Sequence, residues 1–235
     1  LTGGQGVAGS NLRHPDANGG VSNNDHLLSS GSKMTRAMEP RERIRQLARK
    51  RPLFRLSEAV SAGVHPEHVR RLTQQGELTR VGRGLYALPT LQATEHHTLA
   101  EVAKRVPHGI FCLLTALRFH GLGTQNPREV WLAVDRRMGT PRVDFTLVRV
   151  VRISGNALTD GIEEHDVDGV SVRVTSPART VVDCFKFRSK VGVDVAVEAL
   201  RDYRRLRKGT ADELWRQAER LRLAKVMRPY WDGLV

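Results

Sequence analysis

Two aspartates and three histidines are the residues of this chain whose spacing could support catalysis. Asp166 and Asp168 form an Asp-x-Asp pair, which can hold Mg²⁺ in enzymes that handle nucleotides. The second aspartate is followed by glycine, however, and Asp-Gly is a strong signal for a tight hairpin turn, so we favour the structural interpretation. His96, His97 and His165 have no partners at metal-ligand spacing. We therefore predict no catalytic residue, no metal site and no cofactor.

Other enzymatic motifs are missing as well. The stretches VRVVRIS and VSVRVTS resemble strands, but neither carries the acid and the lysine two residues apart that a nuclease site needs. No G-x-x-x-x-G-K-[ST] loop is present. The sequence therefore predicts that the protein is not an enzyme.

A second group of residues is suited to nucleic acid. In the segment HPEHVRRLTQQGELTRVGRGLYAL, residues 65–88, the spacing that buries Val69 and Leu72 on one side of a helix turns polar side chains outward. Arginine and glutamine can read base edges, and arginine also holds phosphate. The candidate DNA contacts are His65, His68, Arg70, Arg71, Gln74 and Arg83. Solvated surface charge and a protein-docking helix are the alternatives for this segment.

The surrounding elements predict a winged helix-turn-helix over residues 39–90. A first helix begins near Pro40, Ser57 caps a short second helix, and Gly63 supplies the turn. A third helix opens at His65-Pro66 and ends at Gly76. Two strands, Leu78 to Val81 and Leu85 to Leu88, then flank Gly82-Arg83-Gly84, whose two glycines accept positive φ. In this arrangement the third helix enters a major groove and the hairpin rests on the backbone.

Residues 91–235 predict a larger, mixed α/β domain, so the fold class is α+β. The expected helices are His96–Val106, Phe111–His120, Ser176–Lys186, Val193–Leu206, one capped by Thr210 and Glu213, and Val226–Leu234. The expected strands are Glu129–Val134, Val148–Ile153, Ile162–Val167 and Val170–Thr175.

A dense cluster of basic residues follows within this second part. At helical spacing Arg201, Arg204, Arg205 and Lys208 share one face, opposite an apolar side that includes Leu206. A stripe of this kind is most often a solvated surface. Few nearby acids compensate it, so binding of a partner protein or RNA at this face is the alternative function.

Composition sets the class of partner. The 235 residues carry 38 Lys and Arg against 25 Asp and Glu, a formal charge of +13, which favours polyanions. Apolar runs are too short to cross a membrane, and Cys112 and Cys184 suit reduced core positions. We expect a cytoplasmic protein. Residues 1–38, rich in Gly, Ser and Asn, predict a disordered leader, with Met34 as the expected biological start.

Four segments in order resemble a known family. They are AGVHPEHVRRLTQQGELTRVGRGLYAL, LLTALRFHGLGTQNPREVWLAV, SPARTVVDCFKFRSKVGVDVAVEALRDY and VMRPYWDGL. Together they are similar to the AbiEi antitoxins of type IV toxin–antitoxin systems, which are also described as transcriptional regulators of viral defence. The leader and the arginine-rich RDYRRLRKG depart from the family pattern.

This resemblance implies a bacterial phage-defence protein with two roles. Its winged helix is expected to bind repeats in its own promoter, as double-stranded DNA, and to repress its operon. Its C-terminal domain is expected to counter a nucleotidyltransferase toxin encoded beside it, and direct contact with that toxin is left open. The family's DNA contacts carry over only to the six helix and hairpin residues named above.

Overall fold

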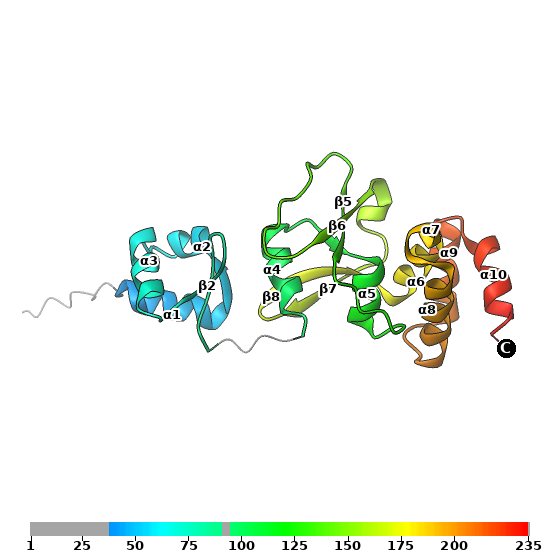
Figure 1. Cartoon of the computed structure of the whole chain (residues 1–235), viewed down its shortest axis with the longest axis horizontal. Coiled ribbons are helices and arrows are strands. Elements are labelled where there is room, and N and C mark those ends of the chain that lie inside the picture. The colour runs from blue at the N-terminus through cyan, green and yellow to red at the C-terminus, as the bar shows by residue number, and fades with distance from the viewer. Residues whose placement is uncertain (1–37, 91–94, 235) are drawn as a thin grey trace, which may run out of the picture. The chain divides into compact units, whose positions relative to one another are not determined.

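The computed structural model describes residues 38–90 and 95–234 (Figure 1). The predicted leader lies outside these residues except for Met38, which is exposed. The domain boundary predicted after residue 90 adjoins residues 91–94, which are likewise outside the described chain.

The described chain contains both helices and sheets, as the predicted α+β class requires. The helices are α1 (Pro40–Lys50), α2 (Leu56–Ser61), α3 (Pro66–Gln74), α4 (His97–Arg105), α5 (Leu113–His120), α6 (Pro177–Lys186), α7 (Arg188–Val191), α8 (Val193–Arg205), α9 (Ala211–Arg220) and α10 (Ala224–Asp232), with a 3₁₀ turn at Gly155–Leu158. The strands are β1 (Leu53–Arg55), β2 (Thr79–Gly82), β3 (Leu85–Ala87), β4 (Ile110–Phe111), β5 (Val130–Asp135), β6 (Val148–Ile153), β7 (Ile162–Val167) and β8 (Val170–Thr175).

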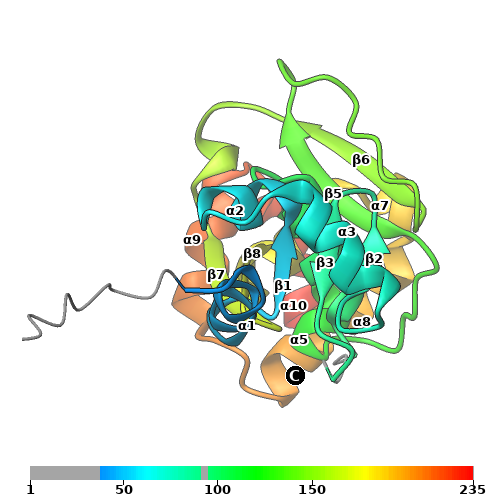
Figure 2. The same ribbon diagram turned by 90° about the vertical axis from the view of Figure 1, so that its left-hand side faces the viewer.

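Helices α1 to α3 and a small antiparallel sheet form the first group of elements, which Figure 2 shows from the side of α1, α2 and α3. The sheet has the order β1-β3-β2, so β3 is its central strand. Ile44 of α1, Phe54 of β1, and Val69 and Leu72 of α3 meet in one apolar cluster. Burial of this cluster therefore fixes which face of each helix points outward.

Three sequence predictions for this group were wrong. Helix α2 begins at Leu56 with Arg55 at the N-cap, and the Glu58 carboxylate reaches back to the Arg55 N–H, so Ser57 does not cap it. Strand β1 was missed because three residues are too few to show alternation. Of the two hairpin glycines, Gly84 has a positive φ of 68°. Gly82 instead belongs to β2, next to an irregularity in the β2–β3 register.

A five-stranded mixed sheet forms the centre of the second group, in the order β6-β5-β4-β8-β7. β4 pairs antiparallel with β5 and parallel with β8, while β7 and β8 form the predicted hairpin. Alternate residues enter different cores: Trp131 and Ala133 join one apolar cluster, and Leu132 and Val134 join another. Both faces of β5 are therefore covered, which explains its continuous apolar sequence.

The prediction of a helix from Phe111 to His120 was wrong at its start. Ile110 and Phe111 form β4, and α5 begins only at Leu113. A two-residue strand followed at once by a helix gives one uninterrupted apolar run, which periodicity alone cannot divide. The missed strand, β4, lies between β5 and β8 and so joins the two halves of the sheet.

Helices α5, α6, α8, α9 and α10 contribute to the cluster on one side of the sheet, while α4 contributes to the cluster on the other. The second cluster also contains Leu53, Leu85 and Ala87 from the three-stranded sheet, so apolar contacts join the two groups. Cys112 and Cys184 are buried and unpaired, as predicted. Within the described residues, no helix combines the length and the apolar character that crossing a membrane requires.

Helix α6 contains a buried ion pair. Arg179 Nε lies 2.8 Å from Asp183 Oδ2, and Arg179 Nη1 donates to the Asp160 carbonyl at 2.7 Å. Burial raises the pKa of Asp183, and the adjacent Arg179 guanidinium opposes that rise. A lone charge at such a position is costly, so the two side chains depend on each other.

We predict that Arg179→Ala lowers the free energy of unfolding by about 3–5 kcal/mol, because Asp183 is then buried without its partner. Urea denaturation followed by circular dichroism measures this change. The matched control is Arg201→Ala on the exposed side of α8, with an expected change within about 0.5 kcal/mol. Equal losses in the two variants would contradict the importance of the buried pair.

Candidate nucleic-acid interface

Helix α3 presents a basic face because its apolar residues are buried on the opposite side. His65 is the N-cap, and its Nδ1 accepts the Glu67 N–H at 3.2 Å, as the predicted start of this helix requires. Val69 and Leu72 are 0% and 5% exposed. Among the predicted contacts, four are exposed, namely His65, Arg70, Arg71 and Gln74, and His68 is half-buried. The structure therefore places four of the six predicted contacts on α3 and a fifth, His65, at its N-cap.

Two of these side chains contact each other. Arg71 Nη2 donates to His68 Nδ1 at 3.0 Å, which restricts the guanidinium on the outward face. Arg70 faces Glu67 at 3.5 Å, with both side chains about two-thirds exposed. Exposed pairs of this kind contribute little energy, so Arg70 can exchange Glu67 for a phosphate at small cost.

The sixth predicted residue, Arg83, lies at the turn of the β2–β3 hairpin and is exposed. Its carbonyl accepts a hydrogen bond from Arg105 Nη1 at 2.8 Å. The contact therefore holds the hairpin through its main chain and leaves the Arg83 side chain in solvent. Arg80, on β2, is exposed as well and adds a cation that the sequence prediction did not include.

Further basic residues missed from the sequence line a cavity of about 260 Å³ beside the hairpin. Arg55, Lys104 and Arg105 line it together with Arg83 and the Ser57 hydroxyl side chain. Lys104 and Arg105 end helix α4, where basic residues are common, and no local pattern indicates that they lie near a hairpin more than twenty residues earlier. Tertiary contact alone shows that these cations share one site.

Glu58 partly neutralises this basic site. Both of its oxygens lie 2.9 Å from Lys104 Nζ, and its carboxylate also pairs with Arg51 and accepts the Arg55 N–H. Burial alone raises the pKa of Glu58, but the hydrogen bonds from Arg55 and Lys104 outweigh burial and lower it overall. The charged carboxylate is thus the form that the fold stabilises.

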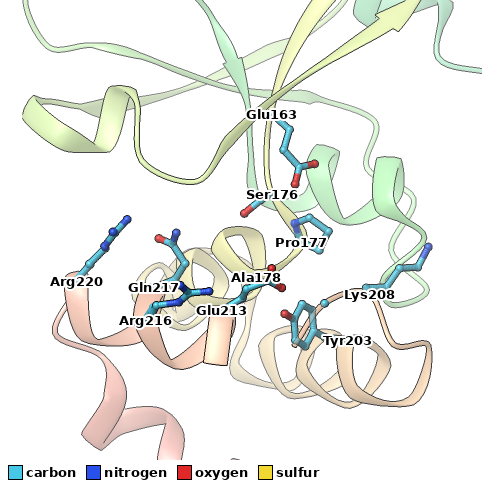
Figure 3. Close-up of a pocket in the computed structure, with 11 residues that line it drawn as sticks. Glu163, Ser176, Pro177, Ala178, Tyr203, Lys208, Glu213, Arg216, Gln217 and Arg220 are labelled. Atoms are coloured by element: carbon cyan, nitrogen blue, oxygen red, sulfur yellow. The ribbon is translucent and has the colours of Figure 1, made fainter. Parts of the chain in front are cut away.

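The predicted basic face on α8 was wrong in its geometry. Helix α8 ends at Arg205, so Lys208 lies beyond the helix, at the edge of a separate pocket (Figure 3). Arg205 Nη2 pairs with Asp202 at 2.8 Å, while Arg204 donates to the Leu234 carbonyl at 2.8 Å and lies over the Trp231 ring. Arg204 and Arg205 therefore have different partners, and Lys208 is not part of the helical face.

The exposure of Leu206 and the acidic residue beside this face also differ from the prediction. Leu206, expected on the apolar side of the helix, is 40% exposed, because the chain turns there and Arg207 takes a positive φ of 50°. Acidic compensation is also present, since Asp202 binds both Arg205 and the Gly123 N–H. Arg201 is exposed on α8.

The Asp-x-Asp pair occupies the predicted hairpin turn. Asp166 Oδ1 accepts the Gly169 N–H at 3.1 Å, and Asp168 takes a positive φ of 53°. Asp168 Oδ2 accepts a hydrogen bond from His97 Nδ1 at 2.6 Å, and the other nitrogen of His97 faces Glu101 at 3.6 Å. Within residues 38–90 and 95–234, no group of three or more His, Cys, Asp or Glu residues is arranged to hold a metal.

The family comparison matches residues 42–89 to transcriptional regulators. The matching family model is described as "Transcriptional regulator, AbiEi antitoxin", which confirms the resemblance inferred from the sequence. The match covers α1 through the β2–β3 hairpin, the segment that carries all six predicted DNA contacts.

A solved structure has a similar fold. The crystal structure of the RV2827C protein from Mycobacterium tuberculosis matches with a TM-score of 0.50 and 18% sequence identity, over 77% of this chain and 71% of that one. At this identity the likeness concerns the fold alone. A search of curated proteins found no match.

Acidification tests the contacts of Glu58. Because the folded-state pKa of Glu58 is lowered, its stabilising contribution is present above the unfolded pKa of about 4.3 and is lost as the pH falls through the lower, folded value. We predict that unfolding midpoints of the wild type fall more steeply below about pH 4.3 than those of Glu58→Gln. Thermal melts between pH 3 and pH 7 measure this, and parallel curves would contradict it.

Proposed function

We propose that this protein is a DNA-binding transcriptional autorepressor and the antitoxin of a type IV toxin–antitoxin system. In this proposal α1 to α3 and the β2–β3 hairpin act as a winged helix-turn-helix. Helix α3 enters the major groove of promoter repeats, and the hairpin contacts the backbone. The observation that carries the proposal is the exposed basic face of α3 opposite buried Val69 and Leu72, within the segment that matches the regulator family.

The chemistry of this face suits duplex DNA. Arg71 is held by His68 and has guanidinium nitrogens for a base edge or a phosphate, and Gln74 lies one turn away at i+3. Arg83 extends from the hairpin as a phosphate contact, and Arg55, Arg80 and Arg105 add positive charge near it. The net charge of +13 increases attraction to any nucleic acid, while α3 supplies the sequence-reading contacts.

The antitoxin role and the toxin belong to the same proposal. The regulator family that residues 42–89 match is described as AbiEi antitoxins, and we propose that the adjacent gene encodes a nucleotidyltransferase toxin that this protein counters in the cytoplasm. We also propose that the protein acts without catalysis. This is supported by the placement of Asp166 and Asp168 in a hydrogen-bonded turn.

DNA binding is tested with the full chain and the intergenic DNA upstream of its gene. We expect Arg71→Ala or Gln74→Ala to weaken operator binding by about 1–3 kcal/mol and to relax preference at one base position. Arg83→Ala should weaken all sequences alike and reduce the salt slope by about one unit. Mobility-shift titrations at several salt concentrations measure both effects.

The control variant is Arg201→Ala, which removes an equal charge from an exposed position on α8 and should leave sequence preference unchanged. Unchanged operator binding by a triple variant, Arg71→Ala with Gln74→Ala and Arg83→Ala, would contradict the proposed interface.

The non-catalytic antitoxin role has its own test. Asp166→Asn keeps an oxygen that can accept the Gly169 N–H but removes the negative charge that a metal needs. We predict that this variant protects cells from the neighbouring toxin as well as the wild type does, measured by growth after co-expression. A loss of protection with unchanged protein level would point to metal chemistry at the hairpin.

A further inference from the structure

A separate pocket of about 480 Å³ lies in the second group of elements, away from the residues assigned to DNA. Its walls are β7, the beginning of α6, the segment between α8 and α9, and one side of α9 (Figure 3). This volume falls within the usual range of small-molecule sites, which is about 300–1,000 Å³.

Three cations line the pocket. Arg216 and Arg220 are four residues apart on α9, and Lys208 stands on the other side of the opening in Figure 3. The contacts of the two arginines within the chain are weak: Arg216 Nε donates to the carbonyl of Asp212 on its own helix at 3.3 Å, and Arg220 lies 3.9 Å from Asp160. Terminal guanidinium nitrogens are thus free to bind an anion.

The floor of the pocket is the N-terminus of α6, a ten-residue helix. Ser176 caps it, Pro177 has no N–H, and the Arg179 N–H is taken by Ser176 Oγ at 3.3 Å. Ala178 also lines the pocket and is the remaining first-turn residue with an N–H. The helix end adds partial positive charge to that of the three side chains.

The pocket also contains hydrogen-bond acceptors. Gln217 Oε1 is buried and has no hydrogen-bond partner within the part of the chain that the structure describes. Glu163 contacts His165 at 3.1 Å, and Glu213 Oε2 accepts the Thr210 N–H at 2.9 Å. The surrounding atoms close this oxygen off from solvent, so the acceptors that a ligand in the pocket can reach are the carboxylates of Glu163 and Glu213.

The cations and the carboxylates that line the pocket together favour one class of ligand. A long RNA would place several negative charges near Glu163 and Glu213, which both carboxylates oppose. A small molecule with one phosphate and several hydroxyls satisfies both sides of the pocket: the cations and the α6 N-terminus hold the phosphate, and Glu163 accepts hydrogen bonds from hydroxyls.

We propose that this pocket binds a phosphorylated sugar, either free or as part of a nucleoside monophosphate. The phosphate lies between Arg216, Arg220 and the first turn of α6, and a sugar hydroxyl donates to the Glu163 carboxylate. This site goes beyond the proposed DNA binding and does not depend on it.

Isothermal titration calorimetry of the full chain tests the proposal, with ribose 5-phosphate and AMP as probes. We expect saturable binding of at least one of them, and weaker binding of ribose and of inorganic phosphate. Comparable affinity for the two probes indicates that the sugar phosphate suffices, and tighter binding of AMP indicates the nucleotide. Absence of saturable binding by both probes would overturn the proposal.

Two sets of variants assign the contacts. Arg216→Ala with Arg220→Ala should weaken binding at least about tenfold, because charge-assisted hydrogen bonds to phosphate are lost. Glu163→Ala should reduce the preference for ribose 5-phosphate over inorganic phosphate. Arg201→Ala with Lys225→Ala, which removes two charges from exposed positions of α8 and α10 outside the pocket, is the control and should bind like the wild type.

Two results would contradict the assigned contacts. Binding unchanged in the double arginine variant, or an unchanged preference in Glu163→Ala, would overturn the assignment. Arg216 and Arg220 are exposed, so their loss should leave the thermal unfolding midpoint close to that of the wild type. This measurement separates loss of ligand from loss of fold.

Discussion

The burial of Val69 and Leu72 is the constraint on which the candidate interface depends. Both side chains join Ile44 and Phe54 in one apolar cluster, so α3 cannot rotate about its axis without exposing them. With that rotation fixed, Arg70, Arg71 and Gln74 are directed into solvent. The burial of a few methyl groups therefore determines which polar side chains of α3 face solvent.

The parts of the fold that followed from the sequence were those with strong local signals. The cap of α3, its apolar spacing and the β7–β8 hairpin each depend on residues close in sequence, and each was predicted. The short strands β1 and β4 were missed, because two or three apolar residues show no period of their own. Their role comes from pairing with distant strands, which no local pattern reveals.

The candidate site shows the same division. Helical spacing was enough to predict that Arg70, Arg71 and Gln74 of α3 face solvent, and the hairpin signal placed Arg83 at the turn. Lys104 and Arg105 could not be found, since only tertiary contact brings the end of α4 to the hairpin. The predicted face of Arg201, Arg204, Arg205 and Lys208 was wrong for Lys208 for a related reason: helical projection assumed that α8 continued past Arg205.

Arg105 holds the hairpin by a hydrogen bond to the main-chain carbonyl of Arg83, so the position of the hairpin does not depend on the side chain at its tip. Any residue at position 83 presents the same carbonyl, so substitutions there can alter charge or shape while the anchoring bond persists. Position 105 has no such freedom, because only its side chain reaches the hairpin. A change of side chain at the tip therefore leaves the anchor of the hairpin in place, whereas a change at position 105 removes it.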